Sequence, residues 1–283
     1  MVTAAPAPSF RVGDRIQEYR LRQVCGQSSF GLVWEAENEK GEGRALRFLP
    51  NPDDPATRQE IRAIQMVARL EHPHLMPIEK VWTIPKYFVV AMILAEGSLH
   101  DLLEAYQTEY GTGIEPVELC GYLTQAASAL DFLNLSKHQL GSWAGGIQHG
   151  DVKPSNLLVF GEKVKLSDCN LASPASRTLQ FGSRVGSAGY VAPEVWQGRV
   201  ADTTDQYALA VTYCFLRGGK LPIIEKPPEL GQVPAPRPAP DLSMLTVPER
   251  PIIARALSLG WRDRWKTCCE LMANLTQAIG KKK

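Results

Sequence analysis

The sequence lacks any apolar stretch long enough to cross a lipid bilayer. Its longest uncharged apolar run of note, residues 207–216, falls well short of the ~20 residues that a membrane-spanning helix needs. The first ten residues are rich in Ala and Pro and contain no basic segment followed by an apolar run, so they do not resemble a secretory signal. We therefore expect no membrane segment in this chain and a cytoplasmic location.

Cysteine is scarce, and an excess of charge of either sign is absent. The 31 Lys and Arg residues face 30 Asp and Glu residues, which gives a net charge of +1 and no indication of a nucleic-acid partner. No CxxC or zinc-type spacing occurs, so we expect reduced thiols rather than metal ligands or disulfides. The six cysteines are Cys25, Cys120, Cys169, Cys214, Cys268 and Cys269. A hydrophobic fraction of 44% indicates a globular protein with a sizeable core.

The first third of the chain has the pattern of a small antiparallel sheet. Short alternating runs separated by glycines predict strands at residues 19–24, 31–36 and 44–49. Helical spacing of apolar residues predicts one helix at 56–70. Strand-like runs at 75–82 and 87–93 complete an expected five-stranded sheet.

After Gly97 the pattern changes to a mainly helical one. The predicted helices cover 99–106, 119–135, 205–216, 248–259 and 265–279, with two short strands at 157–160 and 164–166 and a Pro-rich connector at 221–240. The expected organisation is a leader at 1–18, a β-rich lobe at 19–95, a helical lobe at 96–280 and a basic tail at 281–283. The fold class is therefore α+β, with two lobes.

A polar string at residues 149–156, His-Gly-Asp-Val-Lys-Pro-Ser-Asn, precedes the strand predicted at 157–160. Asp151 can accept the proton of an attacking hydroxyl, Lys153 can neutralise a transferring phosphoryl group, and the amide oxygen of Asn156 can bind a metal. Asp168 follows the next predicted strand and can hold Mg²⁺. A polar turn is the alternative interpretation, but the complete set at this spacing favours phosphoryl transfer.

The chain resembles a eukaryotic-type protein kinase domain, and bacterial serine/threonine kinases in particular, over residues 19–279. The resemblance rests on motifs that follow one another in the family's order. These are Gly26-x-x-x-Phe30-Gly31-x-Val33, Ala45-Leu46-Arg47, His72-Pro73-His74-Leu75, the string at 149–156, Asp168, the segment 186–194 (Gly-Ser-Ala-Gly-Tyr-Val-Ala-Pro-Glu), Asp205 and Arg264. It implies a bilobal kinase-like fold, with a small antiparallel N-lobe sheet, one main N-lobe helix and a larger helical C-lobe.

The resemblance implies roles for individual residues, with ATP and Mg²⁺ as cofactors. Asp151 would be the catalytic base, Lys153 the γ-phosphate contact, Asn156 and Asp168 the Mg²⁺ ligands, and Ser187 a residue that places the substrate hydroxyl. The implied nucleotide-binding residues are Gly26, Gly31, Val33, Ala45, Arg47, Glu60, Met92, Leu94 and Leu158. Two structural links are also implied, a pair between Glu194 and Arg264 and a bond from Asp205 to the backbone of the catalytic loop.

Two departures from the family's pattern concern the ion pair of the N-lobe. Arg47 stands where the family has lysine, and its planar guanidinium is not equivalent to a compact ammonium at a phosphate site. The usual spacing places the partner glutamate at position 63, which is Ala63. Glu60 lies about one turn earlier on the same helix face and is the favoured partner, with a solvent-facing glutamate as the alternative.

Further departures concern the glycine loop and the catalytic motifs. Ser28 replaces the middle glycine, and Asp168-Cys169-Asn170 replaces Asp-Phe-Gly. Cys169 is smaller than Phe and would thin the apolar stack that joins the lobes. Gly150 replaces an Arg that often binds an activation-loop phosphate, so that anchor is missing.

Two functions remain open on these grounds. The first is an ATP- and Mg²⁺-dependent serine/threonine kinase that transfers the γ-phosphate to a protein hydroxyl, with reduced activity. The second is a pseudokinase that acts as a nucleotide-sensing, protein-binding or allosteric module. The presence of Asp151, Lys153, Asn156 and Asp168 favours the enzyme. No residue identifies the protein substrate or partner, and the chain is compatible with one domain of a longer protein.

Overall fold

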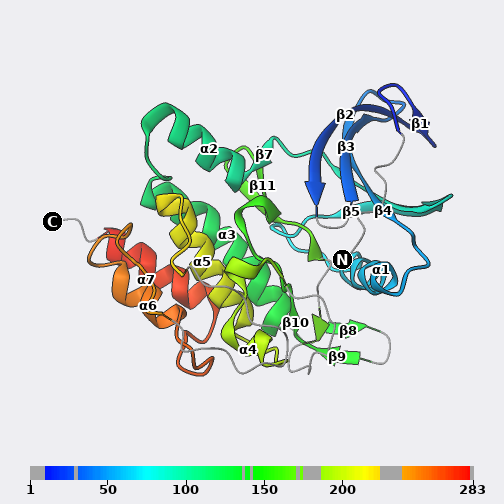
Figure 1. Ribbon diagram of the computed structural model, residues 1–283. Helices are drawn as coiled ribbons and strands as arrows, with labels where there is room; N and C mark the ends of the chain where they lie inside the picture. Colours follow the sequence, from blue (N-terminus) through cyan, green and yellow to red (C-terminus); the bar gives the residue numbers. More distant parts are fainter. Residues whose placement is uncertain are drawn as a thin grey trace. The chain divides into compact units, whose positions relative to one another are not determined.

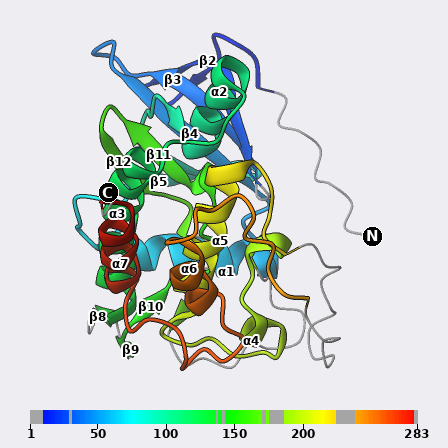
Figure 2. The same cartoon turned by 90° about the vertical axis from the view of Figure 1, so that its left-hand side faces the viewer.

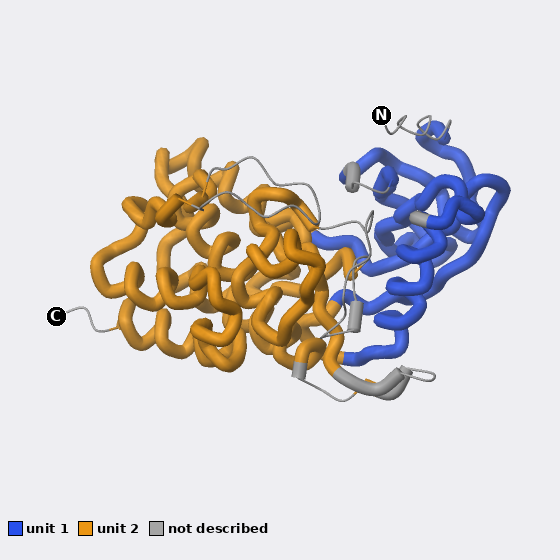
Figure 3. The backbone as a smooth tube through the Cα atoms, turned by 60° about the horizontal axis from the view of Figure 1, so that its bottom comes forward, with its two compact units in different colours: residues 1–71, 76–95 blue, residues 72–75, 96–283 orange. Residues whose placement is uncertain are grey.

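The computed structural model describes residues 10–28, 31–135, 138–140, 143–169, 173–174, 186–223 and 238–280. The chain divides into two compact units, shown in Figure 3. Unit 1 comprises residues 1–71 and 76–95, and unit 2 comprises residues 72–75 and 96–283. Within the described ranges, no helix has the length and apolar character needed to cross a membrane.

Unit 1 is built on one antiparallel sheet with the strand order β1-β2-β3-β4-β6-β5 (Figure 1). Its strands are β1 (Arg15–Ile16), β2 (Tyr19–Ser28), β3 (Gly31–Glu37), β4 (Gly43–Pro50), β5 (Ile78–Ile84) and β6 (Tyr87–Ile93). The central strands carry fully buried side chains, including Leu46 and Phe48 on β4 and Val89 on β6. Unit 1 also contains helix α1 (Pro55–Val67). Asp54 caps the first turn of this helix, because its Oδ2 accepts from the Thr57 amide at 3.1 Å.

Unit 1 begins earlier in the chain than expected, and its sheet has six strands rather than five. Ile16 is buried and pairs with Tyr19 across β1 and β2. The ring of Phe10 packs 4.6 Å from that of Phe48 and 5.3 Å from that of Tyr87. Residues 10–18, expected to belong to the leader, are thus part of the sheet and its core. A two-residue strand is too short to show alternation, which is why the pattern missed it.

Unit 2 is mainly helical, and Figures 1 and 2 show its helices grouped around α3 and α5. The helices are α2 (Leu99–Tyr110), α3 (Pro116–Leu135), α4 (Pro193–Trp196), α5 (Thr204–Gly218), α6 (Arg250–Ala256) and α7 (Cys268–Gly280). Helix α5 is buried along nearly its whole length, so it forms the centre of this unit. A small sheet of β7 (Gly97–Ser98), β11 (Leu157–Phe160) and β12 (Lys163–Leu166) lies beside the helices in the order β12-β11-β7.

Three differences from the expected elements of unit 2 concern short strands and residues 72–75. The loop expected at 140–146 contains part of a hairpin, β8 (His138–Leu140) and β9 (Trp143–Gly145), whose three-residue strands are too short for a pattern. Short strands β10 (Ile147–Gln148) and β13 (Ser173–Pro174) also pair. Residues 72–75, expected in part as a strand of the N-terminal lobe, belong to unit 2, because Leu166 N donates to His74 O at 2.8 Å and Lys165 Nζ to Pro73 O at 2.6 Å.

Candidate active site

The backbone of the polar string is attached to the buried helix α5. Asp205, in the first turn of α5, is 1% exposed and accepts hydrogen bonds from the His149 amide at 2.7 Å and the Gly150 amide at 2.9 Å. Gly150 has φ of 81°, a left-handed conformation that glycine adopts at little cost. The expected link from Asp205 to this loop is confirmed, and it orients the residues that follow.

The side chain of His149 joins the loop to the end of strand β12. The ring is fully buried, its Nδ1 receives the Asp151 amide at 3.2 Å, and its Nε2 lies 2.8 Å from Ser167 O. Asp151 therefore has a backbone position determined by two buried side chains, those of Asp205 and His149.

The carboxylate of Asp151 is the centre of a compact hydrogen-bonded group. Its Oδ1 accepts from the amide and hydroxyl of Ser187, both at 2.9 Å. Its Oδ2 lies 2.9 Å from Lys153 Nζ and accepts from Asn156 Nδ2 at 3.1 Å. Lys153 Nζ also donates to Ser187 Oγ at 2.8 Å. Within unit 2 the structure therefore brings together four of the five residues that the resemblance assigned to catalysis or Mg²⁺ binding, namely Asp151, Lys153, Asn156 and Ser187.

Asp151 is held in its ionised form by these neighbours. Burial alone would raise the pKa of this carboxyl, but the Lys153 ammonium and the Ser187 amide outweigh burial and keep the pKa below its usual value. A carboxylate in this state is able to accept a proton from a hydroxyl group at neutral pH.

Gly186 is a further positioning residue that the motifs alone did not single out. A Cβ atom at this position would lie 2.3 Å from Gly150 O and 3.2 Å from Asp151 Oδ1. Only a residue without a side chain lets this segment approach the loop closely enough for Ser187 to bond Asp151. Its place at the start of the quoted Gly-Ser-Ala-Gly-Tyr motif was the signal that could have identified it.

Asn156 and Asp168 supply the donor types that a magnesium site requires. The amide nitrogen of Asn156 donates to Asp151 O at 2.7 Å, so the amide oxygen lies on the other side of the planar group. Ser167 donates from its amide and its hydroxyl to Asn156 O, at 2.9 and 3.2 Å, which brings Asp168 next to Asn156. Asp168 has φ of 61°, which Asp tolerates better than most residues. Amide and carboxylate oxygens are the donors that Mg²⁺ prefers.

Some residues of the family's motifs and of the departures from them lie outside the described residues. Asn170 and Phe30 are among them, and the side chain of Ser28 is not described, although its backbone pairs with Gly31 across β2 and β3. Cys169 is described and is 9% exposed, so the small thiol is part of the core of unit 2.

Unit 1 contains a buried ion pair. Arg47 Nη2 lies 2.7 Å from Glu60 Oε1, and each side chain is only 4% exposed. The structure thus pairs Arg47 with Glu60, while Ala63 is a buried apolar residue on the same helix. The alternative of a solvent-facing Glu60 is wrong, because the Glu60 side chain is itself buried. Its carboxylate is the counter-charge that a buried guanidinium requires.

Most of the expected nucleotide-binding residues of unit 1 lie on adjoining strands, while Glu60 lies on α1. Gly26 pairs with Val33 across β2 and β3, and Ala45 pairs with Met92 across β4 and β6. A Cβ atom at Gly31 would lie 1.8 Å from Phe48 O, so the chain requires glycine there. Leu94 follows β6 in the same unit, and Leu158 is a half-buried residue of β11 in unit 2.

A second buried ion pair connects elements of unit 2. Glu194 of α4 binds Arg264 through two bonds of 2.7 Å, with side chains 3% and 0% exposed. Arg264 also donates to Thr203 O at 3.0 Å, and Thr204 Oγ1 donates to Glu194 at 2.9 Å. The pairing expected for these two residues is confirmed.

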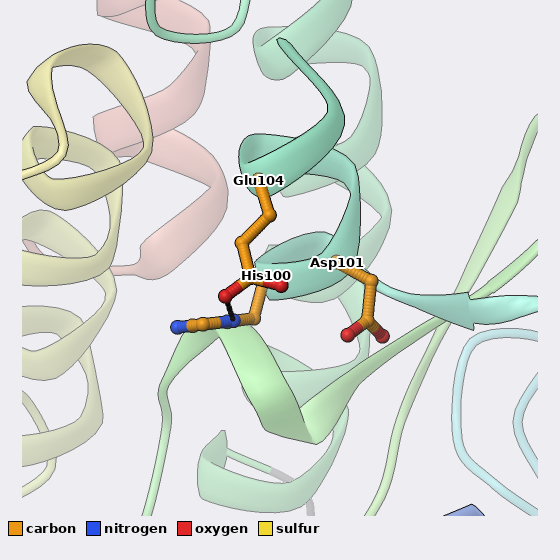
Figure 4. A group of neighbouring side chains, drawn as sticks. All are labelled: His100, Asp101 and Glu104. Carbon is orange, nitrogen blue, oxygen red and sulfur yellow. Dashed lines mark ion pairs between the residues drawn. The ribbon is translucent and has the colours of Figure 1, made fainter. Parts of the chain in front are cut away.

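One group of possible metal ligands among the described residues does not include Asp151 and lies in the first two turns of α2. Figure 4 shows His100, Asp101 and Glu104, whose ligand atoms lie within 4.8 Å of one another. Asp101 Oδ2 accepts from the amide and hydroxyl of Ser98, at 2.7 and 2.8 Å, and caps the helix. Glu104 lies 3.7 Å from His100 Nδ1. Helix capping and this local pair account for the group, and we assign it no metal.

The chain is similar to a family of known proteins. The model of the protein kinase domain matches residues 19–232. The serine/threonine-protein kinase PknH of Mycobacterium bovis is 31% identical over 72% of this chain and 33% of its own length. The corresponding figures for PknE of Mycobacterium tuberculosis are 30%, 95% and 47%. The chain thus spans about a third to a half of the length of these relatives.

A solved structure is similar in fold. The kinase domain of Mycobacterium tuberculosis PknI has a TM-score of 0.70 and 23% identity, covering 96% of this chain and all of that one. The sheet of unit 1 and the helices of unit 2 agree with the expected bilobal α+β fold. The chain belongs to the protein kinase domain family, and its curated relatives are bacterial serine/threonine kinases.

Proposed function

We propose that this chain transfers the γ-phosphate of ATP to a serine or threonine hydroxyl of a protein, with Mg²⁺ as the metal cofactor. The observation that carries the proposal is the ionised Asp151 carboxylate, bound at once by Lys153, Ser187 and Asn156. The names of the relatives support serine/threonine rather than tyrosine specificity.

In this mechanism Asp151 orients the acceptor hydroxyl and takes its proton. The hydroxyl oxygen forms a bond to the γ-phosphorus, the bond to the β–γ bridging oxygen breaks, and ADP leaves. Ser187 and Lys153 both contact Asp151, so they restrict where its carboxylate can point. Lys153 also supplies a positive charge to the transferring phosphoryl group.

Asn156 and Asp168 would hold the metal ion. When bound, Mg²⁺ would neutralise charge on the phosphate oxygens of ATP. The contribution of the chain is to orient two oxygen donors, through the bond of Asn156 to Asp151 and the bonds of Ser167 to Asn156.

Unit 1 would bind the nucleotide through its glycine loop and through Val33, Ala45, Met92 and Leu94. The pair of Arg47 and Glu60 supports an active kinase, because a buried carboxylate directs the cation of β4 as the mechanism requires. The exchange of lysine for arginine in this pair is expected to reduce activity rather than to abolish it.

The test is transfer of radiolabelled phosphate from ATP to a generic acceptor protein in the presence of Mg²⁺. Asp151→Asn should lower transfer by orders of magnitude and leave ATP affinity nearly unchanged, since the base acts only in the chemical step.

Asp168→Ala should abolish the Mg²⁺-dependent thermal stabilisation by ATP. Asp202→Asn, an exposed carboxylate elsewhere in unit 2, is the matched control. Transfer by Asp151→Asn at the wild-type rate would remove Asp151 from the role of base.

Arg47→Lys distinguishes an impaired kinase from a pseudokinase. Restoring a compact ammonium should raise the transfer rate, and a tenfold gain would correspond to about 1.4 kcal/mol of transition-state stabilisation. Glu60→Gln in the Arg47→Lys background should cancel most of this gain. An Arg47→Lys protein that binds ATP tightly but transfers nothing would favour the pseudokinase.

A further inference from the structure

Charge is strongly segregated in this chain although its total is close to zero. Residues 87–136 contain no Lys or Arg and carry seven acids, which leaves 31 cations against 23 acids in the rest of the chain. The seven acids are Glu96, Asp101, Glu104, Glu109, Glu115, Glu118 and Asp131. Four of them are exposed on α2 or at the turn into α3, and these four define the acidic surface, namely Asp101, Glu104, Glu109 and Glu115.

A second surface of unit 2 carries the opposite charge. Around α6, in residues 247–266, the exposed charged side chains are one acid, Asp263, and four cations, which define the basic surface. These four are Arg250, Arg255, Arg262 and Lys266. Two of the guanidinium groups stack on indole rings: Arg255 Cζ lies 3.9 Å from the ring centre of Trp265, and Arg262 Cζ lies 4.0 Å from that of Trp261. Stacking restricts a guanidinium plane and leaves its N–H edges able to bind carboxylates in a bidentate manner.

Each surface also presents two large exposed apolar side chains. Tyr110 and Val117, 61% and 72% exposed, lie at the acidic surface, and Val247 and Leu259, 75% and 60% exposed, lie at the basic surface. In the described part of unit 2, these four are the large hydrophobic side chains that are exposed. Apolar side chains surrounded by charges are typical of protein–protein interfaces.

The two surfaces approach each other on unit 2 where α2 leads into α3 and where the chain enters α6. One side chain joins them, because Arg217 of α5 donates to Ile114 O at 3.1 Å, between α2 and α3, and to Glu249 Oε1 at 3.2 Å, directly before α6. Figure 2 turns the left-hand side of Figure 1 to the viewer and shows α6 on this side, below α2. A two-fold rotation can therefore place the acidic surface of one copy opposite the basic surface of a second copy, and the reverse, at the same time.

We propose that this face of unit 2 binds a second copy of the chain in a two-fold dimer. Charge complementarity favours a second copy as the occupant, since the chain supplies both the carboxylates and the stacked guanidinium groups that would pair with them. The apolar side chains at each surface supply the burial that surface ion pairs alone do not provide. The dimer does not depend on phosphoryl transfer.

The test is a charge swap followed by sedimentation velocity and light scattering on the full 283-residue chain. The acid-reversed variant carries Glu109→Lys and Glu115→Lys, and the base-reversed variant carries Arg255→Glu and Arg262→Glu. We expect the wild type to dimerise, more weakly as salt is raised, and each variant alone to weaken dimerisation by about tenfold or more. An equimolar mixture of the two variants should form a heterodimer, because each then offers the charge that the other lacks.

Lys163→Glu, an exposed reversal on β12 outside both surfaces, should leave dimerisation unchanged. Thermal unfolding and circular dichroism of each variant establish that it is folded. A wild type that stays monomeric at all concentrations overturns the proposal. The same holds if reversed variants dimerise as the wild type does, or if the folded variants remain monomeric when mixed.

Discussion

At the scale of single residues, the behaviour of the site is set by what surrounds each charged group. Asp151 is largely buried, and burial without a partner would favour its protonated form. The ammonium of Lys153 reverses that tendency. If the proposed function is correct, Lys153 therefore has a second task besides contact with phosphate, which is to keep Asp151 able to accept a proton.

This dependence gives a measurable prediction. In Lys153→Met the pKa of Asp151 should rise above its value in the wild type, because the main cause that lowers it is gone and burial remains. Carboxyl carbon chemical shifts followed through a pH titration measure this change. Lys163→Met, which alters an exposed lysine far from Asp151 in sequence, is the control and should have no effect. An unchanged pKa in Lys153→Met would assign the lowering to the bond from the Ser187 amide and to the charge of His149.

The ion pair of unit 1 leads to a prediction of stability. Glu60→Ala removes the carboxylate that a guanidinium only 4% exposed binds at 2.7 Å. We expect a loss of about 3 kcal/mol in the free energy of unfolding, because a buried charge then loses its counter-charge. Urea unfolding measures the loss, and Arg62→Ala, exposed on the same helix, should change stability by no more than about 0.5 kcal/mol. Equal effects of the two substitutions would show that the pair contributes nothing specific.

At the scale of elements, unit 2 depends on side chains that connect segments distant in sequence. Arg264 binds Glu194 of α4 and the backbone before α5, while Asp205 binds the loop that carries Asp151. Each contact uses buried charge, so each is strong only while both partners are present.

Arg264→Met should therefore destabilise the protein by about 3–5 kcal/mol, since it leaves Glu194 buried without its guanidinium. Thermal unfolding measures the effect. Arg199→Met, an exposed arginine that follows α4, is the control and should be nearly neutral. A small effect at Arg264 would mean that Thr204 satisfies Glu194 on its own.

The close approach of two segments at Gly186 gives a prediction about activity. Gly186→Ala places a methyl group 2.3 Å from Gly150 O, so the segment must move away and the bonds from Ser187 to Asp151 must lengthen. If the proposed function is correct, the rate of phosphotransfer should fall about tenfold or more while overall stability changes little.

The control for this substitution is Gly121→Ala. A Cβ atom at Gly121, in α3, would have nothing within 4 Å, and alanine is the better helix former, so stability should rise by about 0.5–1 kcal/mol and activity should stay the same. Full activity of Gly186→Ala would show that the contact between Ser187 and Asp151 is dispensable.

At the scale of the whole molecule, each compact unit has its own core. Leu46 is fully buried in unit 1 and Leu209 is fully buried in unit 2. Replacing either leucine by alanine should cost about 2–5 kcal/mol within its own core. Hydrogen exchange should then show Leu46→Ala raising exchange mainly in unit 1 and Leu209→Ala mainly in unit 2. Equal loss of protection in both units from either substitution would contradict two separate cores.

The sequence by itself determined the features that depend on local periodicity and on motif order. Alternation placed the strand of Arg47, helical spacing placed α3 and α5, and the string at 149–156 identified the loop of Asp151. These features are visible because neighbouring residues in the chain share one element or one turn, so their spacing is their geometry.

Only the tertiary structure decided what depends on contacts between distant segments. It paired Glu60 rather than position 63 with Arg47, because the choice depends on how α1 packs on β4. It assigned residues 72–75 to unit 2, because Leu166 N and Lys165 Nζ, 92 positions later, donate to His74 O and Pro73 O. It also showed that Gly186 must lack a side chain, since the atom that a Cβ would meet belongs to Gly150, 36 positions earlier. Local patterns carry no information on such approaches, which arise only when the chain is folded.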